Sequence, residues 1–333
     1  MAALAVLIAT AFAPAFAQEQ GKEQVKIGTG YGLAFLPIYI CQEMKLVEKH
    51  AKAAHVDVRV SYQHFLSIEL LRAAIDSGDV DVGPFGTAAL LDAWQKGKGT
   101  DKQVFAVSGL TSMPLTLLSN QPNEKSFSDL TADDHIAVPT ATSPQMFLLQ
   151  LQSEKAFGQY DRLQKQTVVS SHADSIAALV QHNDQGVGPV TAYFASPPFT
   201  QFALRDPTVH SILTSADVMN GKFSFLIMGA TKAFIAAHPQ VPQVIAGAVD
   251  EAAKLIHDDP RRAAQIYLTY EPSGSLSGSV LEGIIRDIKD EFGSPVYGVQ
   301  TLADFLAKHG QLKSAPQSWK DIVAPALANS SSS

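Results

Sequence analysis

Residues 79–91, with the sequence DVDVGPFGTAALL, combine a buried strand, a tight turn and a helix start, and they constrain the fold of the chain most. Val80 and Val82 are typical of a short apolar strand, which the glycine and proline residues then interrupt. We expect Thr87 to be the N-cap of a helix that runs through Trp94. The free N–H groups of that helix would lie at the carboxyl end of a strand, where open α/β sheets bind their ligands.

Strand and helix patterns alternate in the first third of the chain. Strand-like segments at 25–28, 56–60, 80–82 and 103–110 are separated by helical ones. This order favours a parallel sheet with helices on both faces. The 333 residues are 46% hydrophobic and 17% charged, which indicates a globular protein with room for about two domains.

A second α/β pattern begins after a polar linker at 120–134. A strand at 135–139 is followed by a turn and a helix that reaches about Phe157. Ser143 is a good N-cap for this helix, and Pro144 suits its first position, where a missing N–H costs nothing. The remaining predicted elements are strands at 167–171, 187–194, 209–213 and 223–228, and helices at 174–182, 241–257, 260–270, 277–292 and 301–309.

A chain that leaves one α/β lobe, builds a second and then returns must cross between the lobes twice. We predict one lobe from residues 18–112 and 213–333, and a second lobe from residues 113–212. The two crossing strands should form hinges near 110–115 and 208–215. Both predicted helix starts follow the carboxyl ends of strands, so we expect them to open onto one cleft between the lobes.

Residues 1–17 have the pattern of a secretory signal peptide. They contain no charged side chain, hold an apolar run from Ala2 to Phe12, and end in AFA before Gln18, although no Lys or Arg precedes the run. A buried first helix or a membrane anchor is the alternative, but the run is shorter than the roughly 20 residues that a membrane span needs. Cys41 is the only cysteine, so no intramolecular disulfide can form. We therefore predict a soluble protein exported to the periplasm.

Several classes of partner have little support. The net charge is −7 and no Lys/Arg run is longer than two residues, which argues against nucleic-acid binding. The GTGYG segment at 28–32 lacks the third glycine of a dinucleotide loop, because Leu33 stands there. His50 and His55 have no carboxylate or cysteine at a metal-ligand spacing. We expect no metal, no cofactor and no catalytic residues.

Segments spread over most of the chain carry a resemblance to a known family. They are LPIYI at 36–40, GDVDVG at 78–83, IAV at 136–138, FIAAHP at 234–239 and DP at 259–260. In this order they resemble periplasmic substrate-binding proteins of ABC importers for nitrate, taurine, sulfonates and thiamine-type pyrimidines. The resemblance implies a type II periplasmic-binding-protein (Venus flytrap) fold, with two α/β lobes that close on one small ligand. It also implies delivery to an ABC permease with its ATPase subunits, and we expect a monomer.

Carried onto this chain, the resemblance places the ligand contacts in turns after strands of both lobes. The residues are Leu33, Ala34, Phe35, His64, Phe65, Phe85, Gly86, Thr87, Thr140, Thr142, Ser143, Ser196, Pro198 and Phe199. These turns contain no Lys, Arg or Asp, so an anion would be held by helix N-termini, hydroxyl groups and His64. The phenylalanine side chains favour a ligand with an organic body: a sulfonate, a carboxylate or a neutral heterocycle.

Other interpretations of the same residues stay open. Phe85 and Phe199 also suit the cores of the lobes, and Ser143 suits helix capping alone. A pyrimidine-synthase-like enzyme of the same superfamily is an alternative function, but its cysteine-rich run and its histidine after the third strand have no counterpart in TAALL at 87–91. A third possibility is a flytrap module that senses a ligand without transporting it.

Overall fold

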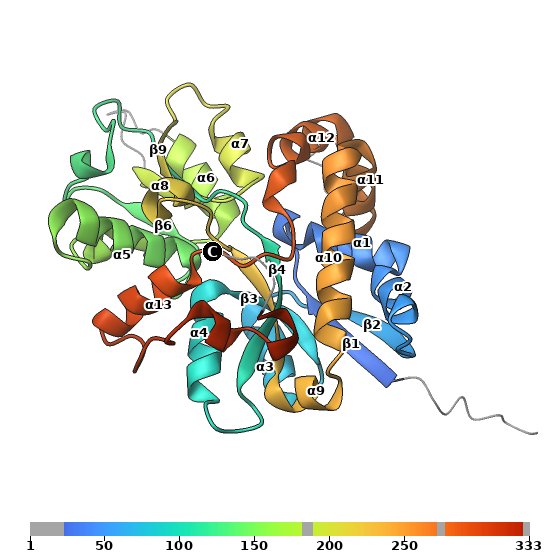
Figure 1. Ribbon diagram of the computed structural model, residues 1–333. Helices are drawn as coiled ribbons and strands as arrows, with labels where there is room; N and C mark the ends of the chain where they lie inside the picture. The colour runs from blue at the N-terminus through green and yellow to red at the C-terminus, as the bar shows by residue number, and fades with distance from the viewer. Residues whose placement is uncertain (1–22, 182–188, 272–276, 329–333) are drawn as a thin grey trace, which may run out of the picture.

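The computed structural model describes residues 23–181, 189–271 and 277–328, which form two α/β lobes (Figure 1). The predicted signal peptide at 1–17 lies outside the described residues. Among the residues that are described, no helix has the length and apolar character needed to cross a membrane.

Lobe 1 is built on a five-stranded sheet with the strand order β2-β1-β3-β10-β4. Its strands are β1 (Glu23–Thr29), β2 (Val58–His64), β3 (Val82–Gly86), β4 (Val104–Thr111) and β10 (Leu226–Thr231). Strand β1 pairs in parallel with β2 and β3, whereas β10 is antiparallel to both β3 and β4. The four strands predicted for the parallel sheet, β1 to β4, therefore run in the same direction, but the antiparallel strand β10 stands between β3 and β4, which was not predicted. Local patterns cannot reveal this, because β10 returns from the other lobe and separates β3 from β4.

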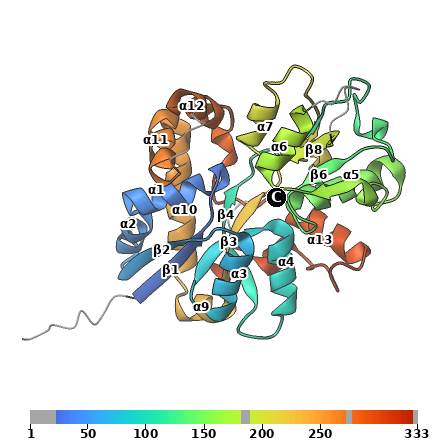
Figure 2. The ribbon, with the colours of Figure 1, turned by 180° about the vertical axis from the view of Figure 1, so that it is seen from behind.

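Helices cover both faces of this sheet, as predicted (Figures 1 and 2). One face carries α1 (Leu36–Met44), α2 (Leu46–Ala53), α10 (Val241–Asp258), α11 (Pro260–Tyr270) and α12 (Gly278–Asp287). The opposite face carries α3 (Ile68–Ser77) and α4 (Thr87–Lys96). The short helix α9 (Lys232–Ala237) follows β10 directly. The predicted helices at 241–257 and 260–270 are confirmed, because their apolar residues recur on one face and pack on the sheet.

Lobe 2 is built on a second five-stranded sheet with the order β7-β6-β8-β5-β9. Its strands are β5 (Thr116–Ser119), β6 (Ile136–Val138), β7 (Thr167–Val169), β8 (Ala192–Ala195) and β9 (His210–Thr214). Strand β6 is parallel to β7 and β8, and β5 is antiparallel to β8 and β9. Helix α5 (Pro144–Phe157) covers one face, and α6 (His172–Val180) and α7 (Phe199–Ala203) cover the other. The predicted strand at 187–194 begins outside the described residues.

The chain crosses between the lobes twice. The first crossing is the short link at 112–115 between β4 and β5. The second crossing lies later than predicted, because Leu213 in β9 still pairs with Leu117 in the sheet of lobe 2. The chain then passes through α8 (Ser215–Met219) and a loop before it enters β10. This crossing is therefore a helix and a loop instead of the strand that the sequence predicted at 208–215.

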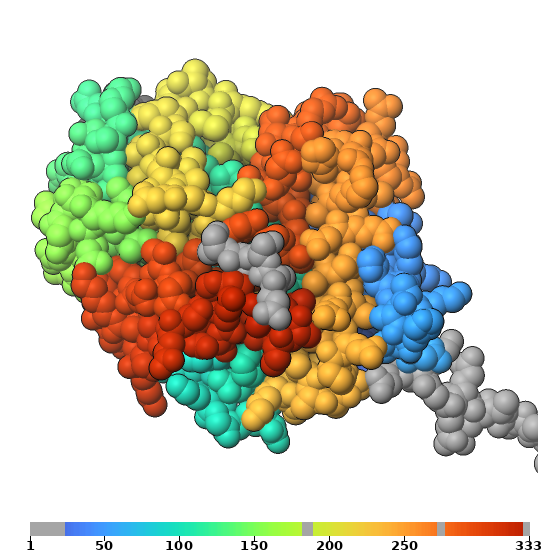
Figure 3. All heavy atoms as spheres, viewed as in Figure 1, coloured from blue at the N-terminus to red at the C-terminus, as the bar shows by residue number. Residues whose placement is uncertain are grey.

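Residues 299–328, here called the C-terminal segment, contact both lobes. The segment starts with α13 (Val299–Lys308), whose end contacts Glu154 in α5 of lobe 2 through an ion pair from Lys308 and a hydrogen bond with Nε2 of His309. It then returns to lobe 1, where the Trp94 Nε1–H donates to the carbonyl of Asp321 over 3.0 Å. In the space-filling view this segment (red) lies against lobe 2 on one side and against α4 (teal) on the other (Figure 3).

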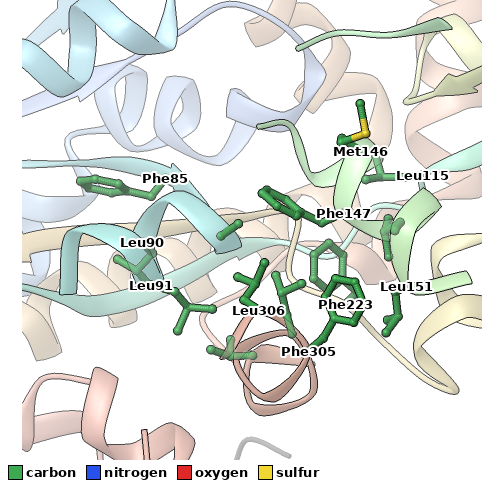
Figure 4. Packing of buried hydrophobic residues seen from close by; sticks show 14 of the residues in the cluster. Phe85, Leu90, Leu91, Leu115, Met146, Phe147, Leu151, Phe223, Phe305 and Leu306 are labelled. Carbon is green, nitrogen blue, oxygen red and sulfur yellow. The ribbon is translucent and has the colours of Figure 1, made fainter. Parts of the chain in front are cut away.

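The interior of the molecule is divided by the two sheets. One apolar cluster fills the α1–α10 face of lobe 1, and a smaller one lies under α6 and α7. The largest cluster runs from α3 and α4 across α13 to α5, so it joins the two lobes (Figure 4). Single-turn 3-10 helices complete the described chain: Leu33–Phe35, Phe127–Asp129, Gln164–Gln166, Lys289–Glu291, Trp319–Ile322 and Pro325–Leu327.

Candidate functional site at the junction of the lobes

The turn between β3 and α4 differs in one respect from its prediction. The N-cap of α4 is Gly86, which has an extended backbone, and Thr87 is the first helical residue. Thr87 is fully buried, and its hydroxyl donates a hydrogen bond to the carbonyl of Ser224, just before β10. The predicted cap at Thr87 is therefore wrong. The hydroxyl fastens the start of α4 to the second crossing instead.

The turn between β6 and α5 has the predicted cap. The Ser143 hydroxyl oxygen accepts a hydrogen bond from the Met146 N–H over 3.3 Å, and Pro144 occupies the first helical position. The same hydroxyl donates to the carbonyl of Thr140 over 2.8 Å. A hydroxyl group has a single proton, so the Ser143 hydroxyl, like that of Thr87, has no further proton to donate to a ligand.

The two turns meet at the junction of the lobes. A side-chain carbon added at Gly86 would lie 3.3 Å from Cγ of Pro144. This is closer than ordinary van der Waals contact, so glycine at position 86 lets the turns of the two lobes approach each other. A polar ligand group at this junction would meet the N–H groups in the first turn of α4, which have no acceptor within the helix.

The predicted residues of the first turn in lobe 1 lie below the surface. Leu33, Ala34 and Phe35 form a 3-10 helix, and each is at most 7% exposed. Phe85 is buried as well, and its ring packs against Gly229 of β10. Phe85 belongs to the same apolar cluster as Leu90 (both are labelled in Figure 4), so the structure places Phe85 in the core of lobe 1.

His64 is the last residue of β2 and Phe65 follows it, and both are half-buried. The His64 ring lies nearly parallel to those of Tyr39 and Tyr270, with centroid distances of 5.7 and 5.8 Å. Its Nε2 lies 3.2 Å from the side-chain oxygen of Gln42. Burial lowers the pKa of His64, while the nearby Glu271 carboxylate partly opposes that shift. Because the Gln42 oxygen can only accept, Nε2 carries the N–H of the neutral ring and donates it to Gln42. The ring then offers a ligand its aromatic face and Nδ1 as an acceptor.

In lobe 2, the turn after β8 presents an aromatic pair. Ser196 and Pro198 are buried, and Phe199 is half-buried at the start of α7. The Phe199 ring stacks on His172, with centroids 4.7 Å apart and planes 13° apart. His172 Nδ1 shares a hydrogen bond with the Tyr193 hydroxyl, and burial lowers the pKa of His172 to about 4.

His172, the stacking partner of Phe199, was not among the residues predicted from the sequence. Ser171 caps α6 two residues after the end of β7, and His172 is the first residue of that helix. This is the same arrangement of a strand followed by a capped helix start that identified Ser143. The signal was present, but the helix had been predicted to begin two residues later, at Asp174.

Glu271 is a second residue that the sequence analysis missed. Its Oε1 accepts hydrogen bonds from the Gly32 N–H over 2.5 Å and from the Tyr39 hydroxyl over 2.6 Å. Its Oε2 accepts from the Tyr267 hydroxyl over 2.9 Å. The Gly32 N–H at the first turn of lobe 1 is therefore already bonded to the protein's own Glu271 carboxylate. No local pattern predicts this contact, because Gly32 and Glu271 are far apart in the sequence.

The polar residues of lobe 2 complete the junction. Thr140 is half-buried, and Thr142 is exposed beside α4 and α5, where it lines a cavity. Among the residues that the structure describes, no group of three His, Cys, Asp or Glu side chains is arranged to hold a metal ion. The predicted turns of the two lobes therefore offer aromatic faces, backbone N–H groups and a few hydroxyl groups.

No protein-family model and no curated protein sequence matches the chain. The chain is similar in structure to the periplasmic aliphatic sulphonate-binding protein SsuA from Escherichia coli, with 18% identity, a TM-score of 0.69, and coverage of 91% of this chain and 92% of that chain. The periplasmic nitrate-binding protein NrtA from Synechocystis PCC 6803 matches with 15% identity, a TM-score of 0.63, and coverage of 93% and 86%.

A third similar structure is a Candida albicans gene product described as having the generic periplasmic binding protein structural fold. It matches with 14% identity, a TM-score of 0.62, and coverage of 93% of this chain and 96% of that chain. All three matches extend over most of both chains, and each includes both lobes at low sequence identity. The chain therefore has the two-lobed fold of periplasmic binding proteins.

Proposed function

We propose that the protein is a solute-binding receptor that captures a small organic molecule between its lobes and delivers it to an ABC importer. The observation that carries this proposal is the contact between Gly86 and Pro144, which brings a helix start from each lobe to one point. Two lobes joined by two crossings can open and close about those crossings. A ligand that touches both turns favours the closed form and shifts this equilibrium.

The chemistry of the junction favours an organic ligand. The stacked pair of His172 and Phe199 in lobe 2, and the half-buried His64 and Phe65 in lobe 1, supply aromatic surface. The similar structures include proteins named for aliphatic sulphonate and for nitrate, both of which are anions. We propose a sulfonate, a carboxylate or a heterocycle as the ligand, with a polar group directed at the first turn of α4.

The proposal includes the cellular context of a receptor. Export to the periplasm follows from the signal-peptide pattern at 1–17, and a permease with its ATPase would be the partner. The similar structures with a printed activity are binding proteins, which supports a receptor without catalysis. We also propose that the receptor acts as a monomer, because a single chain supplies both lobes of the site.

A substitution at the contact between the turns tests the proposed function. Gly86→Leu places a side chain where Pro144 lies within 3.3 Å, so the lobes should no longer approach each other fully. The wild-type protein should be stabilised by one compound of a panel of sulfonates, carboxylates, nitrate and pyrimidines, by about 2.7 kcal/mol at a hundredfold excess over Kd. Gly86→Leu should bind that compound at least tenfold more weakly, as measured by calorimetric titration.

Gly283→Leu is a matched control for this experiment. Gly283 lies in α12, and a side chain added there meets no atom within 4 Å. This variant should bind the compound like the wild type. A panel in which nothing stabilises the wild type would contradict the receptor function. Equal binding by Gly86→Leu and the wild type would contradict the proposed site.

A further inference from the structure

A cavity of about 300 Å³ lies beside the junction, between α3, α4, α5 and the C-terminal segment. Of the residues predicted to bind the ligand, Thr142 alone lines it. Its polar wall includes Arg72, Asp92 and Lys96, and its apolar wall includes Phe147, Leu306 and Leu312. Its volume is at the lower end of the range for small-molecule pockets, roughly 300–1,000 Å³.

The polar wall of the cavity carries two cations and one carboxylate. Arg72 Nη2 lies 3.1 Å from Oδ2 of Asp92, and Lys96 Nζ lies 3.0 Å from the same oxygen. Arg72 Nη1 also donates to the carbonyl of Ala89 over 3.4 Å. A single carboxylate oxygen thus faces two positive groups, and the wall keeps a net charge of +1. An additional anionic group would be attracted here.

Helix geometry holds these groups on one side of the cavity. Ala88, Asp92 and Lys96 are four residues apart in α4, so they share one face of that helix. Arg72 reaches the same place from α3. The side chain of Arg72 is 28% exposed and that of Lys96 is 72% exposed, so both can be reached from solvent.

The opposite wall is apolar and belongs to other parts of the chain. Phe147 comes from α5 in lobe 2, and Leu306 and Leu312 come from the C-terminal segment. Each of these three side chains is at most 8% exposed. Figure 4 shows Phe147 and Leu306 directed toward the same apolar cluster. A bare inorganic anion would leave this wall uncovered, whereas an apolar group would cover it.

We propose that this cavity is a second ligand site, distinct from the junction of the turns, that takes a small organic monoanion with an apolar body, such as a short-chain carboxylate. Arg72 and Lys96 hold the anionic group. Thr142 and Gln311 also line the cavity, with a hydroxyl and an amide group. The apolar body lies against Phe147, Leu306 and Leu312. This goes beyond the proposed function, because a ligand bound here contacts lobe 1, lobe 2 and the C-terminal segment at once and stabilises their closed arrangement.

Calorimetric titration of the full chain with hexanoate tests the proposal. Hexanamide has nearly the same shape without the charge, and sulfate has charge without the apolar body. Hexanoate should bind at least tenfold more tightly than either. Lys96→Met and Arg72→Met keep the length of the side chain and remove its charge, so each should weaken hexanoate binding at least tenfold. Arg72→Lys keeps the charge, so it should weaken hexanoate binding less than Arg72→Met does.

Lys254→Met is the matched control. Lys254 is 74% exposed and pairs with Asp258 four residues later in α10, as Lys96 pairs with Asp92 in α4, but it lies outside the cavity. Its hexanoate affinity should stay within twofold of the wild type. The proposal is overturned if the wild type does not bind hexanoate, if hexanamide or sulfate binds equally well, or if Lys96→Met and Arg72→Met bind hexanoate like the control.

Discussion

Glu124 is a carboxylic acid in the interior of lobe 2, where its side chain is 6% exposed. Its Oε2 accepts a hydrogen bond from the Ser119 hydroxyl over 2.5 Å. Asp134 is nearby and 5% exposed, and its own oxygens accept from the hydroxyls of Thr131 and Thr191. Burial, and then the neighbouring Asp134 carboxylate, raise the pKa of Glu124 to about 7.

The raised pKa of Glu124 predicts a pH-dependent stability. The folded protein binds this proton more tightly than the unfolded chain, so the stabilisation is complete below about pH 4.5 and is lost as the pH rises to about 7. Glu124→Gln removes the titration. Its unfolding free energy, relative to the wild type, should rise between pH 5 and pH 8 by about 1–3 kcal/mol. Urea denaturation at several pH values measures this difference.

Glu69→Gln provides the control for the pH experiment. Glu69 is an exposed residue in the first turn of α3. Its substitution should shift the unfolding free energy by a similar small amount at every pH in this range. A difference between Glu124→Gln and the wild type that stays constant from pH 5 to pH 8 would show that Glu124 does not titrate there.

Single residues differ in how much the sequence reveals about them. The cap at Ser143 could be predicted, because Pro144 fixes the first helical position and leaves the preceding serine as the cap. The role of Thr87 could not, because its hydroxyl donates to Ser224, far along the chain. Glu271 is similar, since its partner Gly32 belongs to the other end of the sequence. Bonds of this kind depend on the fold and leave no local pattern.

Helix α5 allows the cap to be tested at the scale of an element. Ser143→Ala removes both the acceptor for the Met146 N–H and the donor to the Thr140 carbonyl. The loss should be about 1 kcal/mol of unfolding free energy, the usual cost of removing an N-cap. Urea denaturation without ligand gives this value, and the far-UV circular dichroism should stay unchanged.

The adjacent residue supplies the comparison for this cap. Thr142 is exposed and precedes the cap, so Thr142→Ala should change the unfolding free energy by less than about 0.5 kcal/mol. If Ser143→Ala costs no more than Thr142→Ala, then the cap contributes nothing measurable, and the start of α5 is held by packing alone.

Whole elements were predicted where the pattern was long and regular. The apolar face of α10 gives its bounds to within one residue, because the helix extends over five turns. Strand β10 was recognised as a strand, but its place between β3 and β4 could not be found. The pairing of strands from distant parts of a chain depends on the path of the chain between them. From the sequence, the order of the elements along the chain could be predicted, but the neighbours of each strand in the sheet could not.

At the scale of the molecule, the order of elements predicted two lobes and two crossings, but it did not reveal how the lobes are joined elsewhere. The C-terminal segment contacts α5 through Glu154 and then returns to lobe 1 at Trp94. The apolar cluster that extends from α4 through α13 to α5 makes the same connection (Figure 4). The lobes should therefore unfold as one unit, since the packing at their boundary is continuous.

Phe305 of α13 is the residue at which this coupling can be tested. Its side chain is 4% exposed, and it contacts the ring of Tyr160, which follows α5, at a centroid distance of 6.2 Å. Phe305→Ala leaves a cavity between the lobes, so it should cost about 3–5 kcal/mol and lower the melting temperature by several degrees. Scanning calorimetry should also show a broader or divided transition.

Leu204→Ala, at a side chain that is 43% exposed, should melt like the wild type. A sharp transition at the wild-type temperature for Phe305→Ala would mean that the C-terminal segment does not couple the lobes.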